Sequence, residues 1–125
     1  MSHFTTIKTQ IKDIEALRSA CREIKLTVLE KAEARGFAQQ TLRGDYVIKL
    51  NGPYDVALNK EGDGYGLTTD WWDGHVEKEV GLNFGKLLQL YGVHKASMEA
   101  RKKGLSVMRR AKSDGSIKLI LLGAI

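Results

Sequence analysis

The two tryptophans of the chain are adjacent, in the segment Asp70-Trp71-Trp72-Asp73-Gly74-His75, and this pairing constrains the fold more than any other feature. Successive side chains of a β-strand point to opposite faces of a sheet. If the segment is a strand, one ring fills the core, and the other must be covered by a helix, a loop, a partner or a ligand. The segment therefore predicts a layered fold and raises the question of what covers the second ring.

Length and composition indicate one ordinary globular domain, residues 1–125, with 42% hydrophobic and 28% charged residues. No apolar run approaches the roughly 18 residues that span a bilayer. The start of the chain lacks the basic and then apolar pattern of a signal peptide. A single cysteine, Cys21, excludes an internal disulfide and fits a reducing compartment. We therefore expect a cytoplasmic protein without a membrane segment.

The first half of the chain alternates strand and helix signals. Residues 3–11 are rich in β-formers and predict an opening strand. Asp13 can cap a helix whose apolar stripe is spaced three, four and three residues apart, at Ile14, Leu17, Cys21 and Ile24. Residues 26–35 are either a strand or a continuation of this helix, and Gly36 ends both versions. Strands are predicted at 46–50, 54–58 and 65–72, the last two joined by the glycine-rich turn 59–64.

In the second half, an apolar stripe from Val80 to Tyr91 predicts a helix that Gly92 interrupts, followed by a shorter helix over residues 93–103. Asp114-Gly115 between two β-like runs, 105–110 and 116–122, predicts a hairpin. The order of elements predicts an α+β fold, an antiparallel sheet with helices on one face. A helix–glycine–strand–turn–strand pattern near both ends favours a ferredoxin-like arrangement with a weak internal duplication.

Several short motifs occur together and in order along nearly the whole chain. They are Met1-Ser2-His3-Phe4, Arg35-Gly36-Phe37, Tyr54-Asp55-Val56, Asp70-Trp71-Trp72, Lys102-Lys103-Gly104 and Gly115-Ser116-Ile117-Lys118-Leu119. This set resembles a conserved reading-frame family of uncharacterised proteins from cyanobacteria and algal plastid genomes. The resemblance implies a cytosolic or stromal protein, and it carries over no cofactor and no catalytic residue. The segment Asp73-Gly74-His75 departs from the family pattern, which puts a family-wide role for His75 in doubt.

No motif of the chain predicts catalysis or a cofactor. Asp70, Asp73 and His75 have the chemistry of metal ligands, but their spacing matches no dedicated motif, and a polar turn leaving a strand explains them better. Cys21 falls on an apolar helix stripe, where a thiol acts as a small hydrophobe. Gly62-Asp63-Gly64 lacks the strand-to-helix setting of a phosphate loop. We therefore expect no metal and no cofactor, and an enzyme is the third choice among the functions.

The positive charge of the chain is concentrated between His94 and Lys112. That segment holds seven cations against Glu99 alone, a net +6 that leaves −1 for the rest of the +5 chain. The cations are Lys95, Arg101, Lys102, Lys103, Arg109, Arg110 and Lys112. They favour a surface for nucleic-acid phosphates or for an acidic protein partner, or simply a solvated face. No aromatic residue lies between them, so base stacking has little support.

The aromatic residues suggest a second surface. One tryptophan, Trp71 or Trp72, in a partly open groove with Tyr54, Tyr65 and Phe84 would anchor a partner protein. The alternative covers that ring with the helix that begins near Val80. The prediction from the sequence is a non-catalytic binding or accessory factor within a larger assembly. The alternative function is a nucleic-acid-binding module that uses the basic segment 94–112.

Overall fold

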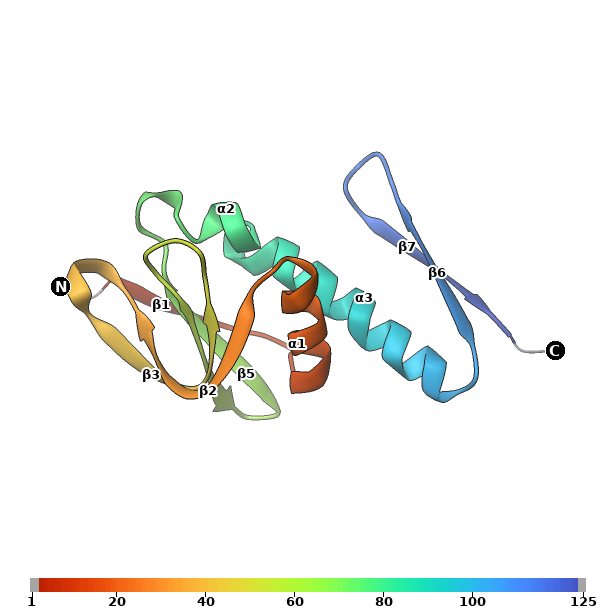
Figure 1. Cartoon of the computed structure of the whole chain (residues 1–125), viewed down its shortest axis with the longest axis horizontal. Coiled ribbons are helices and arrows are strands. Elements are labelled where there is room, and N and C mark those ends of the chain that lie inside the picture. Colours follow the sequence, from red (N-terminus) through yellow and green to blue (C-terminus); the bar gives the residue numbers. More distant parts are fainter. Residues whose placement is uncertain (1–2, 124–125) are drawn as a thin grey trace.

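Five antiparallel strands form one sheet in the computed structural model, which describes residues 3–123 (Figure 1). Strands β2 to β5 pair with their neighbours in sequence, and β1 pairs with β5, which gives the order β1-β5-β4-β3-β2. The strands are β1 (Phe4–Lys8), β2 (Thr27–Arg35), β3 (Thr41–Lys49), β4 (Val56–Glu61) and β5 (Gly64–Asp70). The α+β class with an antiparallel sheet is therefore confirmed.

The ferredoxin-like arrangement is not confirmed. In that fold another strand lies between the first strand and the end of the sheet, whereas here β1 is itself an edge strand. The two remaining strands, β6 (Ser106–Ala111) and β7 (Ile117–Leu122), form a separate hairpin and pair only with each other within residues 3–123. The similar patterns near the two ends of the sequence thus belong to different sheets.

Two helices, α1 (Ile14–Glu23) and α3 (Gly85–Lys102), pack against each other. Asp13 caps α1 as predicted, because its carboxylate accepts the N–H of Ala16 at 3.1 Å. The hydroxyl of Tyr91 on α3 accepts the N–H groups of Lys12 and Asp13, each at 3.1 Å. The start of α1 is therefore fixed to the middle of α3.

The predicted break at Gly92 is wrong, because α3 runs without interruption through that residue. A glycine inside a helix costs about 1 kcal/mol relative to alanine. The buried neighbours Leu90, Tyr91 and Val93 offset this cost by packing along α3. The helix predicted to begin near Val80 also differs: Val80 ends a short helix, α2 (Glu77–Val80), and Phe84 adopts a left-handed conformation directly before α3.

One main core lies between the sheet and the helices. Ile48, Val56, Leu58 and Leu67 of the sheet pack in the same buried cluster as Leu17 of α1 and Leu87 of α3. Val47, next to Ile48 on β3, points to the opposite face, where it forms a small second cluster with Ala34 and Ala57. The buried residues of this second cluster are small, with Leu42 packed against them, and the larger fully buried apolar side chains lie on the helix side.

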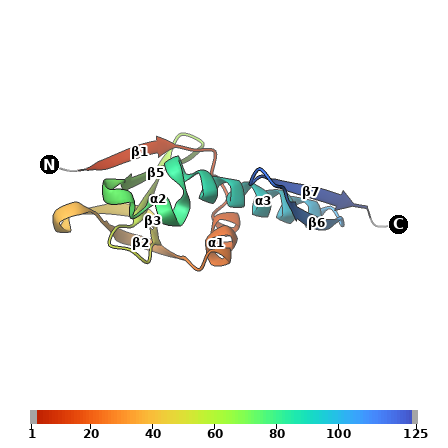
Figure 2. The same cartoon turned by 90° about the horizontal axis from the view of Figure 1, so that it is seen from above.

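The hairpin β6–β7 lies beside α3, at the end of the molecule away from the start of β1 (Figures 1 and 2). The side chain of Gln89 on α3 donates to the carbonyl of Gly115 in the turn at 3.1 Å, and Ile117 packs against the main core. Among the described residues, no helix is long and apolar enough to cross a membrane.

Candidate protein-interaction surfaces

Trp72 is 52% exposed and belongs to a group of three rings that we call the aromatic corner: His3, Phe37 and Trp72. The ring of Phe37 lies 4.8 Å from His3 and 5.7 Å from Trp72, in edge-to-face geometry with both. The corner brings together the start of β1, the turn after β2 and the turn after β5. Trp72 is thus partly covered by its own chain and open on its remaining surface.

The buried carboxylate of Asp70 holds the aromatic corner in place. It accepts the backbone N–H of Trp72 and the backbone N–H of Phe37, each at 2.9 Å. Asp70 is fully buried, so these bonds replace its lost contact with water. The bond to a residue two positions on is an Asx turn, a local signal that sequence reasoning missed.

Trp71 points away from Trp72 and is half-buried against the main core. Its ring lies 4.7 Å from that of the buried Phe84, in the segment that leads into α3. The strand predicted over residues 65–72 ends at Asp70, so the two rings diverge in a turn and not on a strand. Trp71 is therefore the half-buried ring that packs against the core, and Trp72 is the exposed one.

The two tyrosines of the predicted groove do not join Trp72. Tyr54 is only 8% exposed and its ring packs on His75 at 5.4 Å. Tyr65 lies near the other end of β5, where it contacts Tyr46 at 5.9 Å. Of these aromatic side chains, only Trp72 presents a large exposed surface.

A cavity of about 480 Å³ lies at the turn after β2, the turn that also carries Phe37 of the aromatic corner, although none of the three corner residues lines it. Its walls come from Arg35, the turn after β2, Pro53 and Tyr54. In that turn Ala38 and Gln39 both adopt left-handed backbone angles, with φ of 56° and 64°, which non-glycine residues rarely do. Phe37 contacts Trp72 while the next two residues line the cavity, so one short turn joins the two features.

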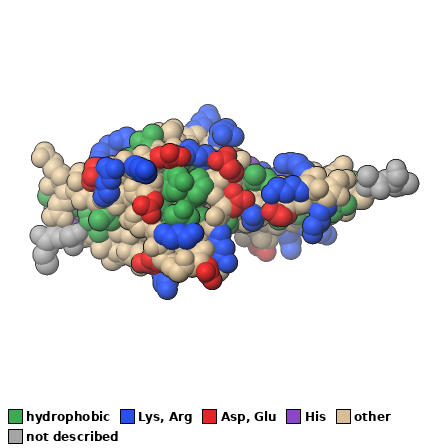
Figure 3. All heavy atoms as spheres, turned by 90° about the horizontal axis from the view of Figure 1, so that it is seen from below, with side chains coloured by type: hydrophobic (Ala, Val, Ile, Leu, Met, Phe, Trp, Pro, Cys, Tyr) green, Lys and Arg blue, Asp and Glu red, His purple; other side chains and the backbone are tan. Residues whose placement is uncertain are grey.

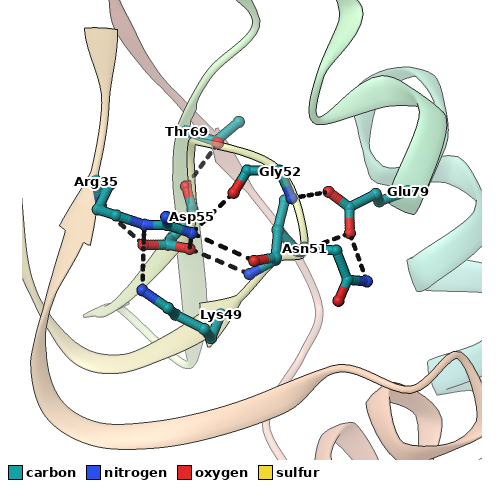
Figure 4. A network of polar contacts seen from close by, with 8 residues as sticks. Arg35, Lys49, Asn51, Gly52, Asp55, Thr69 and Glu79 are labelled. Atoms are coloured by element: carbon teal, nitrogen blue, oxygen red, sulfur yellow. Dashed lines mark hydrogen bonds and ion pairs between the residues drawn. The ribbon is translucent and has the colours of Figure 1, made fainter. Parts of the chain in front are cut away.

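An ion pair between Arg35 and the fully buried Asp55 holds the sheet beneath this cavity (Figure 4). The guanidinium donates to both carboxylate oxygens at 2.8 Å and also to the carbonyl of Gly52 at 2.9 Å. Burial alone raises the pKa of Asp55, but the bonds from Arg35 and from backbone N–H groups outweigh it and lower the pKa below its ordinary value. The network joins β2 to the start of β4 and is structural.

The three candidate metal ligands, Asp70, Asp73 and His75, make hydrogen bonds or ion pairs within the chain. Both oxygens of Asp70 accept backbone N–H groups, and Asp73 lies 3.7 Å from His75 at the surface. Within the described part of the chain, no group of three or more possible ligands could hold a metal ion.

Cys21 is buried as predicted, and burial raises its pKa to about 12, so the reactive thiolate is disfavoured at neutral pH.

The basic segment divides into paired and unpaired cations. Lys95 binds Asp13 at 3.0 Å and Glu99 at 3.1 Å, Lys102 lies 3.6 Å from Glu99, and Arg109 binds Glu23 at 2.7 Å. The other four have no ion-pair partner among residues 3–123: Arg101, Lys103, Arg110 and Lys112. Sequence reasoning missed Lys118, which lies across from Arg110 in the hairpin. Figure 3 shows blue Lys and Arg side chains at the hairpin end of one face, mixed with hydrophobic and acidic ones.

The fold and these surfaces define a small α+β protein with an antiparallel sheet and an appended hairpin. A family model described as a protein of unknown function (DUF1257) matches residues 20–120. Two proteins named "Uncharacterized protein ycf35", from Guillardia theta and Pyropia yezoensis, are 31% and 30% identical over 97% of this chain and 96% of their own length.

The chain therefore belongs to the Ycf35 (DUF1257) family, which confirms the resemblance to plastid reading-frame proteins. No solved structure matches it.

Proposed function

We propose that the protein is a non-catalytic accessory factor that binds a partner protein through the aromatic corner. The observation that carries this proposal is the 52% exposure of Trp72, whose backbone is fixed by buried Asp70. Tryptophan is among the residues that dominate binding energy in protein interfaces. A ring that is already held in place loses little conformational freedom on binding, so more of its contact energy contributes to affinity.

The cavity beside the corner supports the same proposal. The cavity of about 480 Å³ is lined by Ala38 and Gln39, which directly follow Phe37 of the aromatic corner, so we expect a partner that covers Trp72 and Phe37 to extend into it. Interfaces combine a central aromatic contact with a pocket that receives an apolar side chain of the other protein. We therefore expect the partner to present an apolar or aromatic side chain there, on a segment that passes over Trp72.

The alternative, a nucleic-acid-binding module, has weaker support. Lys95, Lys102 and Arg109 are neutralised within the chain. Between His94 and Lys112 there is no aromatic side chain on which a base could stack. Membership of a plastid-encoded family supports a cytosolic or stromal location for either function.

Affinity capture from native extract tests the proposal. Trp72→Ala and Phe37→Ala should each reduce the recovery of the same partner at least about tenfold, the effect of losing roughly 1.4 kcal/mol of binding energy. Leu82→Ala is the matched control, because Leu82 is 66% exposed and lies outside the corner. Its recovery should equal that of the unmodified protein. The proposal fails if all three variants recover the partner equally while their circular dichroism spectra stay unchanged.

A further inference from the structure

The hairpin β6–β7 has two different faces. Directly paired residues of antiparallel strands share a face, and the faces alternate along each strand. Arg109 and its partner Leu119 therefore lie on the inner face, where the guanidinium binds Glu23 of α1 at 2.7 and 3.1 Å. The outer face holds the pairs Ser106–Leu122, Met108–Ile120 and Arg110–Lys118.

The outer face combines exposed apolar side chains with unpaired positive charge. Met108 is 48% exposed and Leu122 is 46% exposed. Leu121, 51% exposed, belongs to the inner face, so the outer face differs from the inner one by joining its apolar side chains to unpaired charge. Arg110 and Lys118 stand directly across from each other, and neither has an ion-pair partner in the described part of the chain. Like charges at directly opposed positions destabilise a strand pair. Arg110 and Lys118 are exposed, so the repulsion costs the hairpin only a small part of its stability, which a bound carboxylate would relieve.

We propose that the outer face of the hairpin docks an acidic, amphipathic segment of a partner protein. Carboxylates of such a segment neutralise Arg110 and Lys118 together, and its apolar residues cover Met108 and Leu122. A second copy of this chain would instead bring Arg110 and Lys118 against the same two cations. A nucleic acid would neutralise the charge and leave the apolar strip uncovered. Charge complementarity combined with apolar area therefore favours the acidic protein segment.

This surface is independent of the aromatic corner, because the hairpin lies at the other end of the molecule (Figure 2). The test uses a fluorescent amphipathic peptide of about 18 residues, five helical turns, with leucines on one face and glutamates beside them. Binding to the full chain is followed by fluorescence anisotropy. A matched peptide carries lysine in place of each glutamate, and a duplex RNA serves as the nucleic-acid probe.

The glutamate peptide should bind, and the lysine peptide should not. Arg110→Glu should weaken binding at least about tenfold, because a like charge then faces the peptide. It places a glutamate opposite Lys118, so the hairpin itself keeps a favourable pair. Lys78→Glu makes the same change of net charge on exposed Lys78 of α2, and should alter affinity by less than about twofold.

Several results would overturn the proposal. The proposal fails if the glutamate peptide binds no better than the lysine peptide. It also fails if Lys78→Glu weakens binding as much as Arg110→Glu does. If the duplex RNA binds more tightly than the glutamate peptide, and Arg110→Glu abolishes that RNA binding, the outer face is a nucleic-acid surface instead. Concentration-dependent dimerisation that Arg110→Glu enhances would assign it to a second copy of the chain.

Discussion

The carboxylate of Asp70 accepts the backbone N–H of Trp72 at 2.9 Å, two residues further along the chain. Through its other oxygen it accepts the N–H of Phe37, which is 33 residues away in sequence. A single buried side chain thus sets the positions of two rings of the aromatic corner. The Asp-Trp-Trp motif contains a buried residue that fixes the corner, a half-buried ring that packs against the core, and an exposed ring.

Asp70→Asn should destabilise the fold and loosen the corner. An amide keeps one acceptor oxygen and turns an NH₂ group toward the second N–H, which leaves one buried donor unpaired. Such a loss costs about 1–3 kcal/mol. Thermal unfolding measures the free energy of unfolding, and tryptophan fluorescence reports a change in the environment of Trp71 and Trp72 together. Asp73→Asn, at an exposed position, should change stability by less than about 0.5 kcal/mol. Equal stability of the two variants would contradict the role given to Asp70.

Arg35→Met should destabilise the fold. It leaves the fully buried carboxylate of Asp55 without its main charged partner. Leaving a buried carboxylate without its hydrogen-bonded partner costs about 1–3 kcal/mol, and the roughly 3–5 kcal/mol of a fully buried pair does not apply because the Arg35 side chain is 39% exposed. The control is Arg43→Met, because Arg43 and Glu33 are both exposed and lie 3.7 Å apart, and such a pair contributes about 0–1 kcal/mol. Urea denaturation of both variants compares the two costs, and similar costs would show that the buried network is unimportant.

Features encoded within a few residues were predictable from the sequence. Asp13 caps α1, and Gly62 and Gly115 form hairpin turns with φ of 62° and 88°, because each signal acts on its immediate neighbours. The segment 26–35 was ambiguous, since Glu30 to Ala34 favour a helix and only pairing with β3 makes it a strand. Local preference was overridden by a partner that lies further along the chain.

The candidate site was less predictable, because it depends on distant contacts. Phe84 decides which tryptophan packs against the core. The turns around α2 bring Phe84 to Trp71, and no local pattern in the sequence shows this contact. Tyr54 and Tyr65 are suitable residue types, and the fold sends them to different places. Arg35 and Asp55, separated by 20 residues, carry no spacing signal for an ion pair. Residue type thus predicted candidates, and tertiary packing selected Trp72 among them.

Acidification should release Arg109 from Glu23. The bonds from Arg109, together with the contact from His94 at 2.7 Å, hold the pKa of Glu23 at about 2, below its ordinary value of 4.5. A lowered pKa means that the stabilisation is present above about pH 4.5 and is lost as the pH falls toward 2. The NMR signals of the Arg109 guanidinium should therefore shift across this range.

Glu23→Gln is the control for this transition, because it removes the titrating group. In that variant the Arg109 signals should stay constant between pH 4.5 and 2. Glu15→Gln, on the same helix and 76% exposed at its side chain, should leave the transition as it is. A transition that persists in Glu23→Gln would show that another group governs the contact between the hairpin and α1.

Reversing one charge of the Arg110–Lys118 pair should stabilise the hairpin even as it removes partner binding. Arg110→Glu converts a cross-strand repulsion into an attraction, which contributes roughly 0.2–1 kcal/mol. Amide hydrogen exchange in β6 and β7 should slow accordingly. Lys118→Glu should do the same, and the double variant, with two glutamates face to face, should return exchange to its original rate. Such a thermodynamic cycle isolates the pair from other effects of each substitution. If each single reversal speeds exchange instead, Arg110 and Lys118 do not repel one another, and the electrostatic argument for an acidic partner is lost.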